Sequence, residues 1–284
     1  MRLDDERRSD HVEDRRGLRI GRTAVGGGIG TLLLVLAALY FGVDPSVLLT
    51  EAPTEVRRPG DAGTEPRPAE ENRLADFVSA VVASTEDTWQ MLFRRAGTEY
   101  REPNVVLFTD AVESACGYAQ SAVGPFYCPE DQKVYIDLGF YKELKDRFKA
   151  PGDFAQAYVI AHEVGHHVQN LLGISRKVQA ARARAGEAEG NRLSVRLELQ
   201  ADCLAGVWAH HAEKTRHILE EGDLEEGLRA AAAIGDDRLQ RQTRGFVIPD
   251  SFTHGSSDQR VRWFRRGIET GDLNRCNTFQ EEDP

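Results

Sequence analysis

Residues 158–171 read YVIAHEVGHHVQNL, and we expect the fold to be built around this stretch. It places His162 and His166 four residues apart, with Glu163 directly after the first histidine. On a helix, side chains four residues apart lie about 5–6 Å from each other at Cβ. Both imidazoles can then reach one tetrahedral zinc ion, with Glu163 beside it to take a proton from a bound water. The pattern predicts a zinc-binding helix, and an amphipathic helix with chance histidines is the alternative.

Apolar residues in the same stretch predict how this helix packs. Ile160, Val164, Val168 and Leu171 repeat at helical spacing on a different face from the two histidines. The helix is therefore expected to pack against a core and to present its polar face to a cleft. His167 points roughly 100° away from the preceding histidine, so we expect it to form a local hydrogen bond and not to bind metal.

The composition limits the class of protein. The chain has 284 residues, which is enough for one large domain or two small ones. Of these residues 40% are hydrophobic, so a sizeable core can be buried. Its formal net charge is -10, and no long basic cluster follows residue 22. These values argue against a nucleic-acid partner.

An uncharged stretch at residues 23–43 is long enough, as a helix, to cross a hydrocarbon core of about 30 Å. Six arginines from Arg7 to Arg22 precede it, and the next basic residue is Arg57. Because basic residues favour the cytoplasmic side, we predict a single-pass protein of the cell membrane, with residues 1–22 in the cytoplasm. A cleaved signal peptide is the alternative, but the acidic N-terminal segment and the lack of a clear Ala-x-Ala site argue against it.

The rest of the chain divides into a linker and an extracytoplasmic domain. Residues 44–70 contain five prolines among charges and predict a flexible linker before a domain over residues 71–284. Two β-prone runs, 105–109 and 134–137, predict paired strands whose exposed edge can bind an extended peptide or serve only as scaffold. The expected fold class is α+β, predominantly helical with a small β-sheet. Helical periodicity predicts further helices over residues 71–95, 138–149 and 190–214.

The cysteines are Cys116, Cys128, Cys203 and Cys276. Their even number on the expected outer side predicts two disulfides, with three possible connectivities. Cys116 and Cys128 flank a loop that contains Gly and Pro and can close it, which leaves Cys203 with Cys276. Buried free thiols are the alternative.

Two carboxylates four residues apart, Glu198 and Asp202, share one face of the predicted helix 190–214. One interpretation explains both: Glu198 completes a zinc site with two histidines, and Asp202 accepts a hydrogen bond from the far nitrogen of a ligand histidine, expected to be His162. The competing candidates for the third ligand are Asp202 itself, His210 and His211.

These motifs resemble those of a known family. HEVGHH followed by ELQAD is similar to the zincin peptidases whose third ligand is Glu, and the whole chain resembles the bacterial family of predicted neutral zinc metallopeptidases. The resemblance implies a zincin-like domain with one Zn²⁺, the ligands His162, His166 and Glu198, and Glu163 as general base. Besides the predicted membrane span, the matching stretches are residues 9–17, 116–137, 161–169, 194–208 and 252–260.

A looser resemblance concerns the end of the domain. Some membrane-associated zincins carry a His-Pro segment followed by an Arg, and His254 and Arg260 occupy similar places here, with Gly255 instead of the proline. His254 is thus expected to donate a hydrogen bond to the transition-state oxyanion. A loop residue before a helix over 256–267 is the alternative, and the role of Arg260 stays open.

The sequence therefore predicts a membrane-anchored zinc metallopeptidase, which hydrolyses protein or peptide substrates through Glu-assisted attack of a zinc-bound water. The alternatives are a catalytically inactive, membrane-tethered zinc-binding scaffold and a zinc amidase that acts on cell-wall peptides. The sequence indicates no oligomeric state and no particular substrate.

Overall fold

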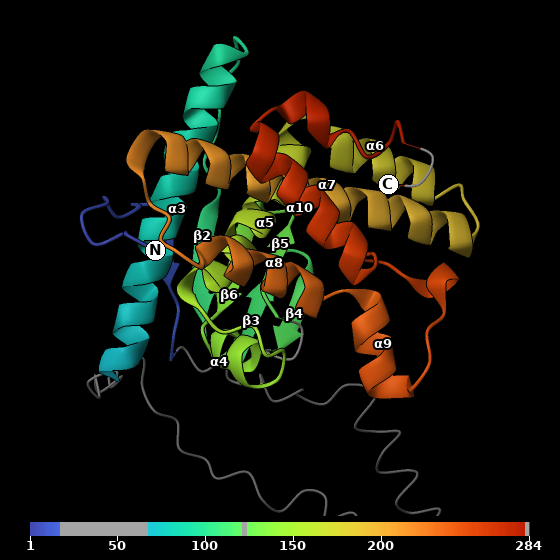
Figure 1. Cartoon of the computed structure of the whole chain (residues 1–284), viewed down its shortest axis with the longest axis horizontal. Helices are drawn as coiled ribbons and strands as arrows, with labels where there is room; N and C mark the ends of the chain where they lie inside the picture. Colours follow the sequence, from blue (N-terminus) through green and yellow to red (C-terminus); the bar gives the residue numbers. More distant parts are fainter. Residues whose placement is uncertain (18–67, 121–123, 282–283) are drawn as a thin grey trace, which may run out of the picture. The chain divides into compact units, whose positions relative to one another are not determined.

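The computed structural model of the chain describes residues 1–17, 68–120, 124–281 and 284 (Figure 1). This part is mostly helical with a small sheet, the α+β class that the sequence predicts. Its α-helices are α3 (Ala69–Arg95), α4 (Gly139–Asp146), α5 (Asp153–Leu171), α6 (Ile174–Arg182), α7 (Glu187–Arg216), α8 (Asp223–Ala233), α9 (Asp236–Arg244) and α10 (Ser257–Thr270). Short 3-10 helices are η2 (Pro249–Ser251) and η3 (Leu273–Cys276). The strands are β1 (Val12–Asp14), β2 (Asn104–Phe108), β3 (Ala111–Ser114), β4 (Gly117–Gln120), β5 (Phe126–Cys128) and β6 (Lys133–Asp137).

The main sheet of the described residues has the strand order β1-β2-β6-β5. β2 and β6 contain the two runs that the sequence predicts to pair, and they lie parallel with Val105 opposite Val134. β1 is parallel to β2, whereas β5 runs antiparallel to β6. β3 and β4 form a separate hairpin. Because β5 ends the sheet, one of its edges has no partner strand within the part of the chain that the structure describes.

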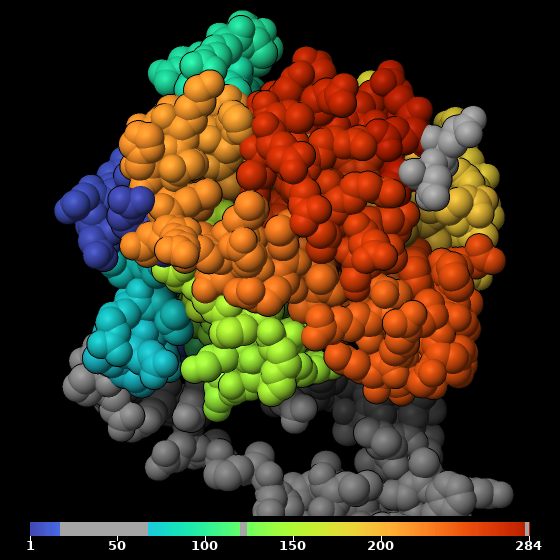
Figure 2. All heavy atoms as spheres, in the orientation of Figure 1, coloured from blue at the N-terminus to red at the C-terminus, as the bar shows by residue number. Residues whose placement is uncertain are grey.

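Helix α5 lies at the centre of the helical part, where α3, α7 and α8 pack against it. Ile160, Val164 and Val168 are fully buried, which confirms the packing face that the apolar spacing predicts. Trp208 of α7 and Trp263 of α10 are fully buried as well. In the space-filling view, the chain from α8 to α10, coloured orange to red, makes up much of the centre and right of the face seen (Figure 2).

Two disulfides join distant parts of the fold. Cys116, between β3 and β4, is bonded to Cys128 at the end of β5. Cys203 in α7 is bonded to Cys276 in η3. This is the pairing that the sequence favours over the other connectivities.

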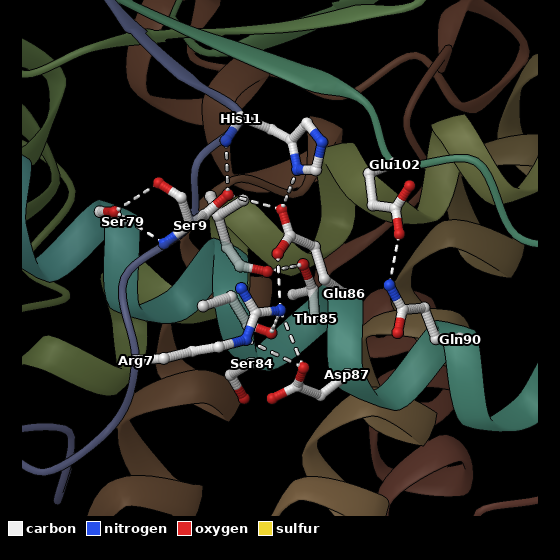
Figure 3. A network of polar contacts seen from close by, with 12 residues as sticks. Arg7, Ser9, His11, Ser79, Ser84, Thr85, Glu86, Asp87, Gln90 and Glu102 are labelled. Carbon is white, nitrogen blue, oxygen red and sulfur yellow. Dashed lines mark hydrogen bonds and ion pairs between the residues drawn. The ribbon is translucent and has the colours of Figure 1, made fainter.

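Residues 1–17 pack against α3 and the sheet. β1 extends the sheet, with Val12 opposite Val105. In the middle of α3, the Glu86 carboxylate is only 2% exposed, and Arg7 Nη2 and Ser9 Oγ donate hydrogen bonds to it at 2.7 and 2.5 Å. Its Oε1 atom also lies 2.9 Å from His11 Nδ1 (Figure 3). Buried carboxylates need such partners, so this segment is an integral part of the folded unit.

This packing corrects the predicted location. Residues 1–17 belong to the same compact unit as residues 69–281, and a strand ladder requires its strands to be in direct contact. The two parts therefore do not lie on opposite sides of a membrane. The prediction of a single-pass membrane protein with a cytoplasmic segment 1–22 and an extracytoplasmic domain 71–284 is wrong.

Of the six arginines that indicated the cytoplasmic side, the four in the described residues bind carboxylates of the folded unit instead. Arg8 pairs with Asp76 of α3, and Arg16 with Asp14 of β1. In the described ranges, no helix is both long and apolar enough to cross a membrane. The predicted span over residues 23–43 lies outside these ranges, as does most of the predicted linker.

Candidate metal centre

His162, Glu163 and His166 lie on one turn of α5 and line a cleft of about 500 Å³. The two imidazole rings have centroids 4.8 Å apart, as their four-residue spacing predicts. His162 and Glu163 are only 5% and 8% exposed. The turn therefore brings two nitrogen ligands and one carboxylate to a site that is largely shielded from water.

Glu198 reaches this turn because α5 and α7 pack closely. A Cβ atom on Gly165 would lie 3.1 Å from the backbone oxygen of Ala201, so the glycine permits the approach of the two helices. Glu198 Oε2 then lies 3.2 Å from His162 Nε2, and Oε1 lies 3.4 Å from His166 Nε2. The structure thus brings together the three side chains that the sequence singled out as metal ligands.

The geometry of these three side chains fits a zinc ion. Each offers one ligand atom, and the three atoms lie within 4.8 Å of one another. Around a tetrahedral zinc with bonds of about 2.0–2.1 Å, ligand atoms lie roughly 3.3 Å apart. The distances of 3.2 and 3.4 Å, each to a different oxygen of Glu198, are close to this value. Two imidazoles and a carboxylate also match the ligand types that zinc binds in enzymes.

The ionisable groups of the cluster stabilise one another's charged forms. Burial opposes protonation of His162, but Asp202 and Glu198 raise its pKa to about 9. Although burial favours the neutral form of Glu198, the two histidines hold its pKa well below the ordinary value. Burial also raises the pKa of Glu163, which makes it a better proton acceptor at neutral pH.

Asp202 contacts the far nitrogen of His162, where we expect it from the sequence. Its Oδ1 lies 2.8 Å from His162 Nδ1, which leaves Nε2 to face Glu198. Asp202 is fully buried, and Arg260 of α10 binds both of its oxygens, Nε to Oδ2 at 2.9 Å and Nη2 to Oδ1 at 2.8 Å. The Tyr158 hydroxyl also donates to Oδ1. Arg260, whose role the sequence left open, therefore neutralises the carboxylate that holds a candidate ligand.

Sequence reasoning missed a residue that contacts the far nitrogen of His166. Gln169 Oε1 lies 2.9 Å from His166 Nδ1, and Gln169 Nε2 donates to Leu197 O of α7 at 2.7 Å. The same amide nitrogen donates to Gln200 Oε1, and Gln200 Nε2 donates to Cys276 O. The spacing of three residues from His166 was the available signal, since residues three apart share a helix face.

His254 lies at the mouth of the cleft, with its side chain 53% exposed. Asp236 Oδ2 accepts hydrogen bonds from the backbone N–H groups of Thr253, His254 and Gly255. Its other oxygen lies 3.3 Å from His254 Nδ1, and this contact raises the pKa of His254. His254 also precedes Ser256, the N-cap of α10, so both interpretations of its position agree with the structure.

The rival ligands lie elsewhere. His210 Nδ1 and His211 Nε2 are within hydrogen-bond distance of backbone oxygens, those of Ile268 and Gly271. Asp202 faces the far nitrogen of His162 and not the cluster.

Comparisons with known proteins identify a family that the chain matches over most of its length. A family model described as "putative neutral zinc metallopeptidase" matches residues 1–279. The uncharacterized protein YpfJ of Escherichia coli K12 is 51% identical over 98% of this chain and 99% of its own length. The uncharacterized protein Rv2575 of Mycobacterium tuberculosis H37Rv is 43% identical over 87% of this chain and 86% of its own. No solved structure matches the chain, so the zincin-like character of the fold stays a prediction.

Proposed function

Since the chain belongs to this family of neutral zinc metallopeptidases, we propose that it binds zinc through His162, His166 and Glu198 and hydrolyses peptide bonds. The observation that carries the proposal is the convergence of two Nε2 atoms and one carboxylate in a cleft, at 3.2 and 3.4 Å. A zinc ion held there supplies a Lewis acid and lowers the pKa of a bound water to about 7.

Glu163 is the proposed general base. It directly follows His162 and lines the same cleft, and burial raises its pKa. It accepts a proton from the attacking water and passes it to the leaving amine. His254, at the mouth of this cleft, donates a hydrogen bond to the oxyanion that forms on the substrate carbonyl.

The proposed substrate is an extended segment of a peptide or protein. Phe126 and Tyr127 of β5 line the cleft together with the metal cluster, and β5 has one free edge in the described sheet. A free edge binds an extended chain through main-chain hydrogen bonds. The cleft also has apolar walls, contributed by Phe140 of α4 and Leu239 of α9, which suit apolar side chains.

A structural zinc site is the main competing proposal. Such a site is closed by a fourth protein ligand. Among the described residues, the cluster contains only three candidate ligands, and His210 and His211 contact other groups. An open fourth position favours hydrolysis. The cell-wall amidase alternative uses the same residues on a different substrate.

The proposal predicts that the purified full-length chain binds one zinc ion and cleaves casein or a quenched peptide library. A chelator that removes the zinc abolishes cleavage, and added zinc restores it. The variants His162→Ala and Glu198→Ala lose the metal, as elemental analysis measures. Cleavage that survives complete removal of metal refutes the proposal, and cleavage of wall peptides alone favours the amidase.

The hydrogen bond from His166 to Gln169 predicts a role of this glutamine in zinc affinity. Gln169→Met keeps the side-chain volume but removes the acceptor that orients the imidazole. Loss of such an orienting contact weakens metal binding by about 10–100-fold. Competition with a chromophoric chelator measures the affinity. Gln179→Met is the matched control, because Gln179 is exposed on α6. Equal zinc affinity in the two variants contradicts this role.

A further inference from the structure

Three polar side chains connect β5 to the helix that carries the candidate ligands. The Tyr127 hydroxyl of β5 accepts a hydrogen bond from Asn170 Nδ2 at 3.0 Å and lies 3.1 Å from His167 Nδ1. His167 directly follows His166 on α5, and Asn170 lies one turn further along the same helix. We call Tyr127, His167 and Asn170 the β5 clamp.

The backbone oxygen of Arg101 determines which atoms of the β5 clamp donate and which accept hydrogen bonds. His167 Nε2 lies 2.7 Å from the backbone oxygen of Arg101. Because a carbonyl oxygen only accepts, Nε2 carries the proton. In the neutral ring Nδ1 is then an acceptor, and the Tyr127 hydroxyl donates to it. His167 is only 1% exposed, so no water competes for this bond. The hydroxyl thus has both a donor and an acceptor on α5.

The strand ladder alone does not fix β5 relative to the metal cluster. β5 is three residues long and, among the described strands, pairs with β6 alone, where Tyr127 lies opposite Val134. A disulfide holds one end of β5 through Cys128. These contacts tie β5 to β6 of its sheet and to the hairpin of β3 and β4. Among the polar contacts of the described residues, the link from β5 to α5 runs through the Tyr127 hydroxyl.

Two of the three residues of the β5 clamp lie outside the cleft. Tyr127 lines the cleft with His162 and His166, whereas His167 and Asn170 do not. A displacement of β5 would therefore shift a bound peptide relative to the cluster without changing any ligand atom. A shift of about 1 Å in the position of a reacting group can lower a rate by roughly 10²-fold.

We propose that His167 and Asn170 are positioning residues: through the Tyr127 hydroxyl they hold β5 at a fixed distance from the metal cluster, so that a peptide paired with β5 presents its scissile bond there. This inference rests on the proposed peptidase function and specifies which residues align the substrate. Tyr127 contacts the substrate, and the two α5 residues act through it.

The test uses the zinc-loaded full-length chain and the variants Tyr127→Phe, Asn170→Ala and the double variant. Tyr127→Phe removes one oxygen and keeps the ring. We expect kcat for quenched peptides to fall about tenfold in Tyr127→Phe, with KM and zinc content little changed. Asn170→Ala lowers kcat less. Because both changes break the same link, the double variant loses no more than Tyr127→Phe alone.

Tyr135→Phe is the matched control. Tyr135 lies in β6 opposite Phe126, and its hydroxyl donates to Asp131 and not to α5. The control therefore removes a tyrosine hydroxyl from the same sheet and leaves the β5 clamp intact. An equal loss of kcat in Tyr135→Phe, or additive losses in the double variant, would overturn the inference.

Hydrogen exchange of the backbone amides gives a readout that does not depend on activity. We expect faster exchange at residues 126–128 in Tyr127→Phe than in the unaltered chain, and no change in the Tyr135→Phe control. If the unaltered, zinc-loaded chain cleaves no peptide, the proposed function fails, and exchange alone then decides whether the β5 clamp holds the strand. Unchanged exchange at residues 126–128 overturns the clamp in either case.

Discussion

Glu163→Gln will lower kcat for peptide hydrolysis by about 10²–10⁴-fold and leave the zinc content unchanged. The side-chain amide keeps the shape of the carboxylate but cannot take a proton from the attacking water. Glu163 contributes no atom to the cluster of three candidate ligands, so metal binding does not depend on it. Steady-state kinetics and metal analysis of the same sample measure both quantities.

Glu143→Gln provides the control for this prediction. Glu143 of α4 lines the same cleft, but its side chain is 42% exposed and pairs with Arg147. The same chemical change is therefore made in the same cleft, away from the candidate ligands. Full activity of Glu163→Gln would refute the general base. Loss of zinc from this variant would show that Glu163 holds the metal site together.

Arg260→Met will lower the free energy of unfolding of the zinc-loaded protein by about 3–5 kcal/mol. Arg260 is 2% exposed and binds both oxygens of the fully buried Asp202. Without the guanidinium, a buried carboxylate keeps only the hydrogen bonds from His162 and Tyr158. Breaking a buried ion pair on one side is costly, because the remaining charge has left water without full compensation. Urea denaturation measures the change.

Arg265→Met is the control for the loss of charge. Arg265 lies on the same helix, α10, but is exposed, and exposed substitutions change stability by about 0.5 kcal/mol or less. If Arg260→Met is no less stable than Arg265→Met, the pair with Asp202 does not stabilise the fold. The zinc affinities of Arg260→Met and Arg265→Met can be compared in the same way. A lower affinity in Arg260→Met alone indicates that Asp202 needs Arg260 to orient His162.

The metal cluster could be predicted from the sequence because each of its parts is encoded locally. His162 and His166 are one turn apart on one helix, and the same spacing separates Glu198 from Asp202 on another. What the sequence does not contain is the packing of the two helices, which depends on Gly165 lying against Ala201. The pairing of Glu198 with Asp202 nevertheless pointed to Glu198 as the third ligand, and the resemblance to a family implied the same set of residues.

The errors and omissions concern contacts between distant segments. Arginines near an uncharged stretch are the usual signal for a cytoplasmic flank, but Arg7 binds Glu86 of α3. Neither residue reveals the other in the sequence. β5 has only three residues, too few for an alternating pattern to stand out. Tyr127 gave no signal for a different reason: its partners on α5 lie about 40 positions away in the sequence.

The docking of residues 1–17 has a consequence for the order in which the chain acquires its structure. Arg2 donates a hydrogen bond to the backbone oxygen of Leu219, 217 positions later, and Ser9 reaches Glu86 across 77 positions. On a ribosome, residues 1–17 are made before their partners: Val12 waits for Val105 of β2, and Arg2 waits for Leu219. Such non-local contacts slow folding. We therefore expect the docking of residues 1–17 to be slower than the formation of the local helical turns.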